Sequence, residues 1–242
     1  MRFTESMAHL AVALRDPLAE YTELLRAMRE GIDDTLEATE RELSRMAAEE
    51  GHPFDWGGGT FKDLLRGKPG PGGGFEASPA VLAFFLTAYL LDCPRREAAA
   101  KALDMTFAAS AYFKSAPSPT TWIANSPIPL QPLRGKKGEA VCARTKQRYF
   151  GAAFVALLSD RALFDQVEEI RVSADLGAAQ LLFGDYTTSN FYTPACYNKT
   201  RPGTYSMRFL YLDMIRPLFD LINPPEPATR APARKRLLTA NN

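Results

Sequence analysis

Residues 60–78, TFKDLLRGKPGPGGGFEAS, and the apolar residues 79–91 that follow, PAVLAFFLTAYLL, decide the fold. Thr60 is a favourable helix N-cap and Asp63 stands where a capping box needs its acidic residue, so the spacing predicts a short helix over 61–66. The Gly/Pro run that follows excludes regular helix, because proline lacks an amide donor and glycine permits positive φ. We therefore expect a short capped helix and then a turn or protruding loop.

Helices are expected on both sides of this stretch. Ser78 and Pro79 form a helix start, an N-cap followed by proline at the first helical position, and residues 81–91 are apolar nearly all round, as in a central core helix. Apolar residues recur at helical spacing in two amphipathic segments within residues 18–51. A further helix is expected over 92–113, because Asp-Cys-Pro repeats the start signal.

The second half of the chain is expected to fold as a separate unit. Five prolines between residues 117 and 132 predict an extended linker over 115–139, which divides a helical domain at 1–114 from a small α-β-β-α domain at 140–223. The parts expected in the second domain are a helix over 141–158, a short helix over 161–167, two strands over 169–173 and 180–183, a polar loop over 186–204 and a helix over 207–222. The basic tail 224–242 has few packing residues, so we expect disorder there.

Composition restricts the classes of function. Lys and Arg total 29 against 28 Asp and Glu, so a positive surface for an acidic partner must come from local clustering. The three cysteines are widely spaced, and His9 and His52 are the only histidines, which leaves little material for a metal site or for histidine catalysis. We predict no enzyme activity, no catalytic residues, no metal and no cofactor. The paired carboxylates at 33–34 and 49–50 are expected at helix ends, where adjacent side chains diverge and solvation explains them better than catalysis. A carboxylate-only hydrolase is kept as a minor alternative.

Two other function classes are disfavoured. Gly67-Lys68 is similar to the end of a phosphate-binding P-loop, but that motif needs Ser or Thr next, and Pro69 stands there instead. Residues 1–16 lack the apolar core of a signal peptide, and no later run approaches the ~20 apolar residues that span a bilayer. We therefore expect a cytoplasmic protein without a membrane partner.

The short capped helix, the Gly/Pro loop and the apolar helix come in the order expected of a winged helix. Over residues 33–91 the chain resembles the recognition-helix and wing region of MerR-like and phage excisionase-like regulators. The resemblance implies that Lys62 and Arg66 contact the DNA groove or phosphates, and that Lys68 on the wing contacts the adjacent backbone. Thr60, which starts the recognition helix, belongs to the same expected DNA-binding set.

This segment also departs from the family pattern. Residues 70–74 are all glycine or proline, which leaves little sequence for the two paired strands of a wing. A flexible loop between core helices is the alternative interpretation. Arg134, Lys136 and Lys137 form a basic patch in the expected linker and are a second predicted nucleic-acid contact.

The expected fold is mainly α, with a winged-helix-type first domain. The expected function is that of a sequence-specific DNA-binding transcriptional regulator. We expect a bacterial protein that is related to phages or mobile elements. Its partner would be double-stranded DNA, bound as a homodimer because one short helix with few cations gives little affinity. The alternative is a non-enzymatic accessory protein of a phage or mobile element that works through protein contacts made by residues 140–223.

Overall fold

Four helices come first in the chain. The computed structural model describes residues 2–54, 56, 60–66, 77–111, 141–193 and 206–224. The helices are α1 (Phe3–Leu14), α2 (Leu18–Gly31), α3 (Asp34–Glu49) and α4 (Phe61–Arg66). The amphipathic pattern and the caps account for α2 to α4, whereas α1 was not expected.

Helix α5 (Pro79–Leu91) is the central core helix that its composition predicts. The Ser78 hydroxyl caps it by accepting the Val81 amide at 3.2 Å, and nearly every α5 side chain is buried. A 3-10 turn, η1 (Arg95–Glu97), and α6 (Ala98–Thr106) follow. The helix expected over 92–113 is therefore wrong at its C-terminal end, where the chain turns into strand β1 (Ala109–Ala111).

The second half supplies four more strands. They are β2 (Val167–Ser173), β3 (Ala178–Phe183), β4 (Thr188–Tyr192) and β5 (Arg208–Tyr211), and with β1 they form one antiparallel sheet in the order β1-β4-β3-β2-β5. The strands expected at 169–173 and 180–183 are confirmed as β2 and β3. The expected polar loop over 186–204 instead contains β4, which pairs with both β3 and β1.

Three helices accompany these strands: α8 (Phe150–Ser159), α9 (Arg161–Phe164) and α10 (Leu212–Ile222). The helix expected over 141–158 begins only at Phe150, and the one expected over 207–222 begins only after β5. The fold is thus mixed α+β and mainly helical, and the α-β-β-α order is corrected by β4, β5 and the contribution of β1.

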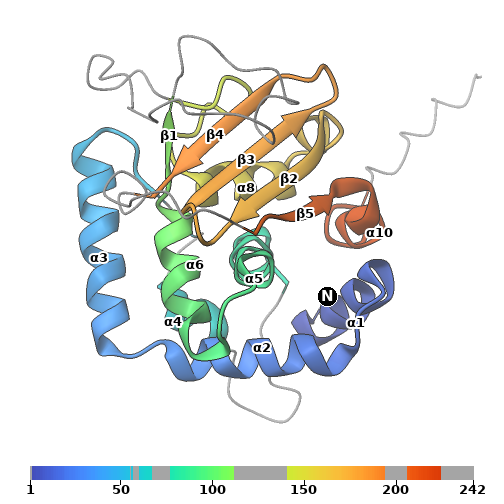
Figure 1. Cartoon of the computed structure of the whole chain (residues 1–242), viewed down its shortest axis with the longest axis horizontal. Helices are drawn as coiled ribbons and strands as arrows, with labels where there is room; N and C mark the ends of the chain where they lie inside the picture. Colours follow the sequence, from blue (N-terminus) through green and yellow to red (C-terminus); the bar gives the residue numbers. More distant parts are fainter. Residues whose placement is uncertain are drawn as a thin grey trace, which may run out of the picture.

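One hydrophobic core joins the two halves. Buried side chains from Phe3 to Phe219 form a single cluster. Helix α5 packs on α6, α8 and β2, and α1 packs on α10. Figure 1 shows α8 behind the sheet and α2 and α3 along the outside of the helical part. The expected boundary therefore does not separate two cores among the described residues, while the linker 115–139 and the tail beyond residue 224 lie outside them.

Candidate functional site

The N-terminus of α4 is capped as its sequence predicts. The Thr60 amide and hydroxyl both donate to Asp63 Oδ2 at 3.0 Å. A second, distant cap comes from Glu40 on α3, whose two carboxylate oxygens accept the Phe61 amide at 3.0 and 3.1 Å. Glu40 is only 3% exposed, and this burial, together with repulsion by Glu37 and Asp63, raises its pKa to about 7.

Lys62 lies in an ion-paired bridge between α4 and α3. Its ammonium group donates to Glu37 Oε2 at 2.9 Å and to Asp34 Oδ1 at 3.1 Å, and these hydrogen bonds raise the pKa of Lys62. Its neighbours Phe61 and Leu65 are buried, and Phe61 stacks on Phe84 with ring centroids 3.6 Å apart. A DNA phosphate would have to displace two carboxylates to reach Lys62.

The remaining residues of the expected DNA-binding set are not brought together by the described structure. Arg66 ends α4, but its side chain lies outside what is described, as do Lys68, Arg134, Lys136 and Lys137.

Ion pairs with carboxylates neutralise most of the cations in the described ranges. They include Arg41, Arg45, Arg95, Arg144, Arg148, Arg161, Arg208 and Arg216.

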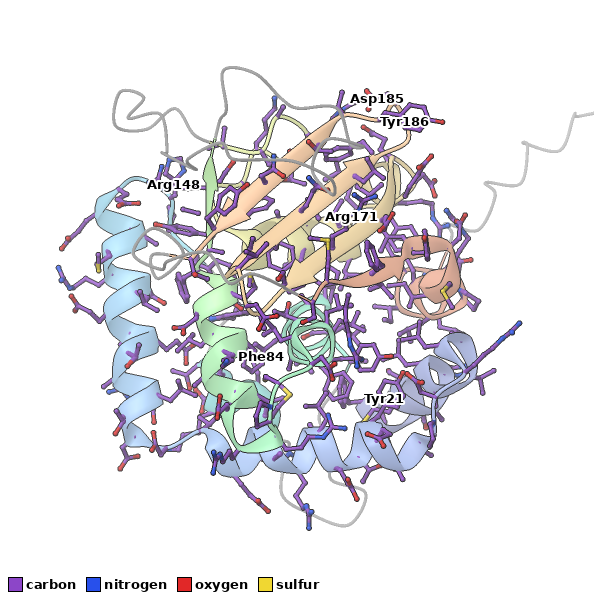
Figure 2. The ribbon with its side chains drawn as sticks, viewed as in Figure 1. Tyr21, Phe84, Arg148, Arg171, Asp185 and Tyr186 are labelled. Carbon is purple, nitrogen blue, oxygen red and sulfur yellow. The ribbon has the colours of Figure 1, made fainter. Side chains whose placement is uncertain are left out.

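The two faces of the sheet differ in character. On the face toward α8, the Phe191 ring meets the Phe150 ring at a centroid distance of 5.6 Å, and Ile170 and Leu181 are fully buried beside it. Side chains alternate between faces along a strand, so the opposite face carries their neighbours in sequence. Figure 2 shows Arg171 on this second face.

The pairing register aligns a polar row across the second face. Arg171 of β2 stands opposite Gln180 of β3 and Phe209 of β5, and Gln180 stands opposite Asn190 of β4. We call these four residues, together with Tyr211, the sheet-face site. The site joins four strands, and because directly paired residues share a face, Arg171, Gln180, Asn190 and Phe209 point to the same side of the sheet.

Arg171 is held by a partly buried ion pair. Its Nε and Nη2 atoms donate to the two carboxylate oxygens of Glu169 at 2.9 and 3.2 Å, in a bidentate arrangement. The two side chains are only 13% and 7% exposed. The guanidinium also lies 5.6 Å from the ring centroid of Phe209. Burying such an ion pair costs desolvation energy that largely offsets the attraction between the two charges. The burial of Arg171 and Glu169 is therefore weak evidence that the pair stabilises the fold.

Gln180 carries a buried acceptor that is not satisfied. Its Nε2 donates to Asn190 Oδ1 at 2.7 Å, but its Oε1 has no hydrogen-bond partner, although the residue is only 4% exposed. An unsatisfied buried acceptor costs about 1–3 kcal/mol. A ligand that donates a hydrogen bond to this oxygen would recover that energy.

Two aromatic rings beside the row are exposed. Phe209 is 48% and Tyr211 is 54% exposed, and both lie on β5, the edge strand of the described sheet. As alternate residues of one strand they share a face and stand about 7 Å apart along it. The sequence did not reveal them, because residues 207–222 fit one helix and Phe209, Leu210 and Tyr211 show no alternation of polar and apolar side chains that would indicate a strand.

Other chemistry is sparse in the described ranges. Cys142 is buried and accepts the Ser189 hydroxyl at 3.2 Å, and Cys93 is partly buried. Within those ranges no group of three or more His, Cys, Asp or Glu side chains could hold a metal ion. None of the helices described there is both long and apolar enough to cross a bilayer.

Comparison of the chain with protein-family models, with curated proteins and with solved structures found no match. The functional assignment therefore rests on the residues themselves.

Proposed function

We propose that this chain binds single-stranded nucleic acid at the sheet-face site. The observation that carries the proposal is the pair of exposed rings, Phe209 and Tyr211, on one face of the edge strand beside a polar row. Exposed aromatic side chains on a sheet are the platform on which unpaired bases stack, and each stacked base contributes about 1–3 kcal/mol. Side chains of the adjoining row can meet the edges of the stacked bases.

The charge needed for a polyanion is present in the sequence next to this sheet. Residues 112–140, which follow β1, and residues 194–205, which follow β4, contain six Lys and Arg against one Glu. Arg134, Lys136 and Lys137 of the predicted basic patch are among the six. Since each segment starts at the end of a sheet strand, these cations are tethered to the sheet by the chain itself, and they support a salt-dependent contact with phosphates.

The test is fluorescence anisotropy with a labelled single-stranded 12-mer of mixed sequence at several salt concentrations. The double variant Phe209→Ala/Tyr211→Ala should weaken binding at least tenfold, because about 1.4 kcal/mol corresponds to a factor of ten. Tyr186→Ala is the matched control: this tyrosine is 74% exposed but stands at the turn between β3 and β4 (Figure 2), so its loss should change little. Absence of binding, or equal binding by all variants, would reject the proposal.

A second candidate is the cytoplasmic regulator that binds duplex DNA through α4, as a winged-helix homodimer. The capping box at Thr60 favours it, because α4 begins where the resemblance requires a recognition helix. The balanced charge of Lys62 weighs against it. A mobility shift with a random duplex pool, using the triple variant Lys62→Ala/Arg66→Ala/Lys68→Ala, tests this candidate, and mass measurement during size exclusion tests the dimer.

If neither single strands nor duplexes bind, the non-enzymatic accessory protein that acts through protein contacts is the remaining proposal.

A further inference from the structure

We infer that Arg171 and Glu169 are positioning residues of the sheet-face site, and that they hold the Phe209 ring in place for a base to stack on it. The inference rests on the proposed binding of single-stranded nucleic acid. It adds the part of the fold that fixes the stacking ring before the nucleic acid arrives.

The ion pair lies directly beside the two exposed rings. In the pairing of β2 with β5, Glu169 stands opposite Tyr211 and Arg171 stands opposite Phe209. Directly paired residues share a face, as do positions two apart on one strand, so the four side chains form a two-by-two array on one face. The charged half of the array is buried and the aromatic half is exposed. Figure 2 shows Arg171 on this face.

Contacts run from Glu169 through Arg171 to Phe209. The Glu169 carboxylate accepts Nε and Nη2 of Arg171 at 2.9 and 3.2 Å, and two hydrogen bonds to one carboxylate fix the orientation of the guanidinium plane. The guanidinium lies over the Phe209 ring, 5.6 Å from its centroid, which is within the range of a cation–π contact. The carboxylate therefore sets the position of the cation, and the cation sets the position of the ring.

Packing alone does not call for charges at these two positions. Replacing a buried ion pair by apolar residues of similar volume is often neutral or stabilising. Apolar side chains would fill the same space, but they would not supply the electrostatic attraction that holds a cation over the face of a ring. The contact with Phe209 is what the ion pair adds to this part of the sheet.

A ring held in this way is prepared for stacking. The guanidinium lies over one face of Phe209, and the side chain is still 48% exposed, so ring surface remains for a base. Fixing a mobile side chain during association costs free energy, and a contact that fixes it in the free chain removes that cost from binding. Loss of the contact should therefore weaken nucleic-acid binding about fivefold.

The experiment replaces both charges at once, because removing one would leave the other buried and unpaired. The double variant Glu169→Leu/Arg171→Met should keep the urea midpoint of the full-length wild-type chain. By fluorescence anisotropy it should bind the mixed-sequence single-stranded 12-mer about fivefold more weakly. Should this variant fail to fold, Glu169→Gln is the second variant: it is nearly isosteric, weakens the hold on Arg171 and should show the same change in smaller measure.

A cycle of variants separates positioning from a direct contact. In a Tyr211→Ala background the double change should again weaken binding about fivefold, whereas in a Phe209→Ala background it should have no further effect, because the ion pair acts through that ring. The salt dependence of binding should stay the same throughout. A direct contact of Arg171 with a phosphate would instead weaken binding in every background and lower the salt slope by about one, and this result would overturn the inference.

A spectroscopic readout needs no nucleic acid. With 4-fluorophenylalanine placed at position 209, the ¹⁹F resonance of the free chain should shift when the ion pair is replaced. The same label at position 150, a buried ring on the opposite face, is the matched control and should keep its resonance.

The outcomes distinguish the inference from the proposed function. If the wild-type chain binds the 12-mer and the double variant binds it equally tightly, or if the resonance at position 209 does not change, the inference is overturned while the proposed function stands. If no 12-mer binds the wild-type chain, the proposed function fails and the inference fails with it.

Discussion

Glu40 makes the docking of α4 on α3 dependent on pH. Its pKa rises from an ordinary value of 4.5 to about 7, mainly because the carboxyl group is buried. A tenfold change in proton affinity corresponds to about 1.4 kcal/mol, so ionising Glu40 in the folded chain costs about 3 kcal/mol of folding stability. The folded state holds its proton more tightly than the unfolded state, so this stability is fully present below pH 4.5 and is lost as pH rises through 7.

The variant Glu40→Gln isolates this contribution. Glutamine keeps a neutral oxygen that can accept the Phe61 amide, so the variant should match the wild type near pH 4.5 and become more stable than it, by up to about 3 kcal/mol, at pH 8. Urea unfolding at a series of pH values measures the difference, and subtracting one protein from the other removes the titration of all other groups.

Glu37→Gln is the matched control with the opposite sign. The hydrogen bond from Lys62 lowers the pKa of Glu37, so its carboxylate stabilises the fold above pH 4.5 and that stability is lost at lower pH. This variant should be less stable than the wild type at neutral pH and should approach it in acid. A difference between Glu40→Gln and the wild type that stays constant from pH 4.5 to 8 would refute the assignment of a raised pKa to Glu40.

Three further predictions concern stability, each measured by urea unfolding. Gly151→Ala should destabilise the fold by about 1–3 kcal/mol, because an added Cβ would lie 2.5 Å from Thr106 Cγ2; an unchanged midpoint would contradict this contact. Thr60→Ala should cost about 1 kcal/mol through loss of the α4 cap, and a neutral result would mean that Glu40 alone suffices. Phe150→Ala should cost about 3–5 kcal/mol and leave one cooperative transition; two separate transitions would contradict the shared core.

Local signals in the sequence predicted helices α4 and α5 well. The capping box at Thr60, the Ser78-Pro79 start and the apolar composition of residues 81–91 each lie within one helix, and each was confirmed. These signals work because the hydrogen bonds and the buried stripe of a helix are formed between residues three or four positions apart.

The edge strands could not be read in the same way. Residues 109–111 and 208–211 continue a helix-compatible pattern, and they are strands because β4 and β2 offer them backbone partners from distant parts of the chain. Pairing of this kind is non-local and overrides local propensity. The division into two domains stays a prediction, but α5, which precedes the proline-rich sequence, packs on α8, which follows it.

The candidate site depended on the same distant contacts. The sequence shows Lys62 as a cation on a short helix, but its partners Asp34 and Glu37 precede it by more than twenty residues, so the balanced charge was not visible. Phe209 and Gln180 become neighbours of Arg171 only through the strand register. A polar row that crosses three strands has no signature in a linear sequence.

The most direct test of the sheet-face site is photochemical cross-linking of the full-length chain to a single-stranded 12-mer that contains 5-iodouracil, followed by mass spectrometry of the linked peptide. The account predicts a cross-link to Phe209 or Tyr211 on β5, which unlabelled single strand competes away. Specific cross-links confined to residues 60–66, with none on β5, would contradict it and direct attention back to α4.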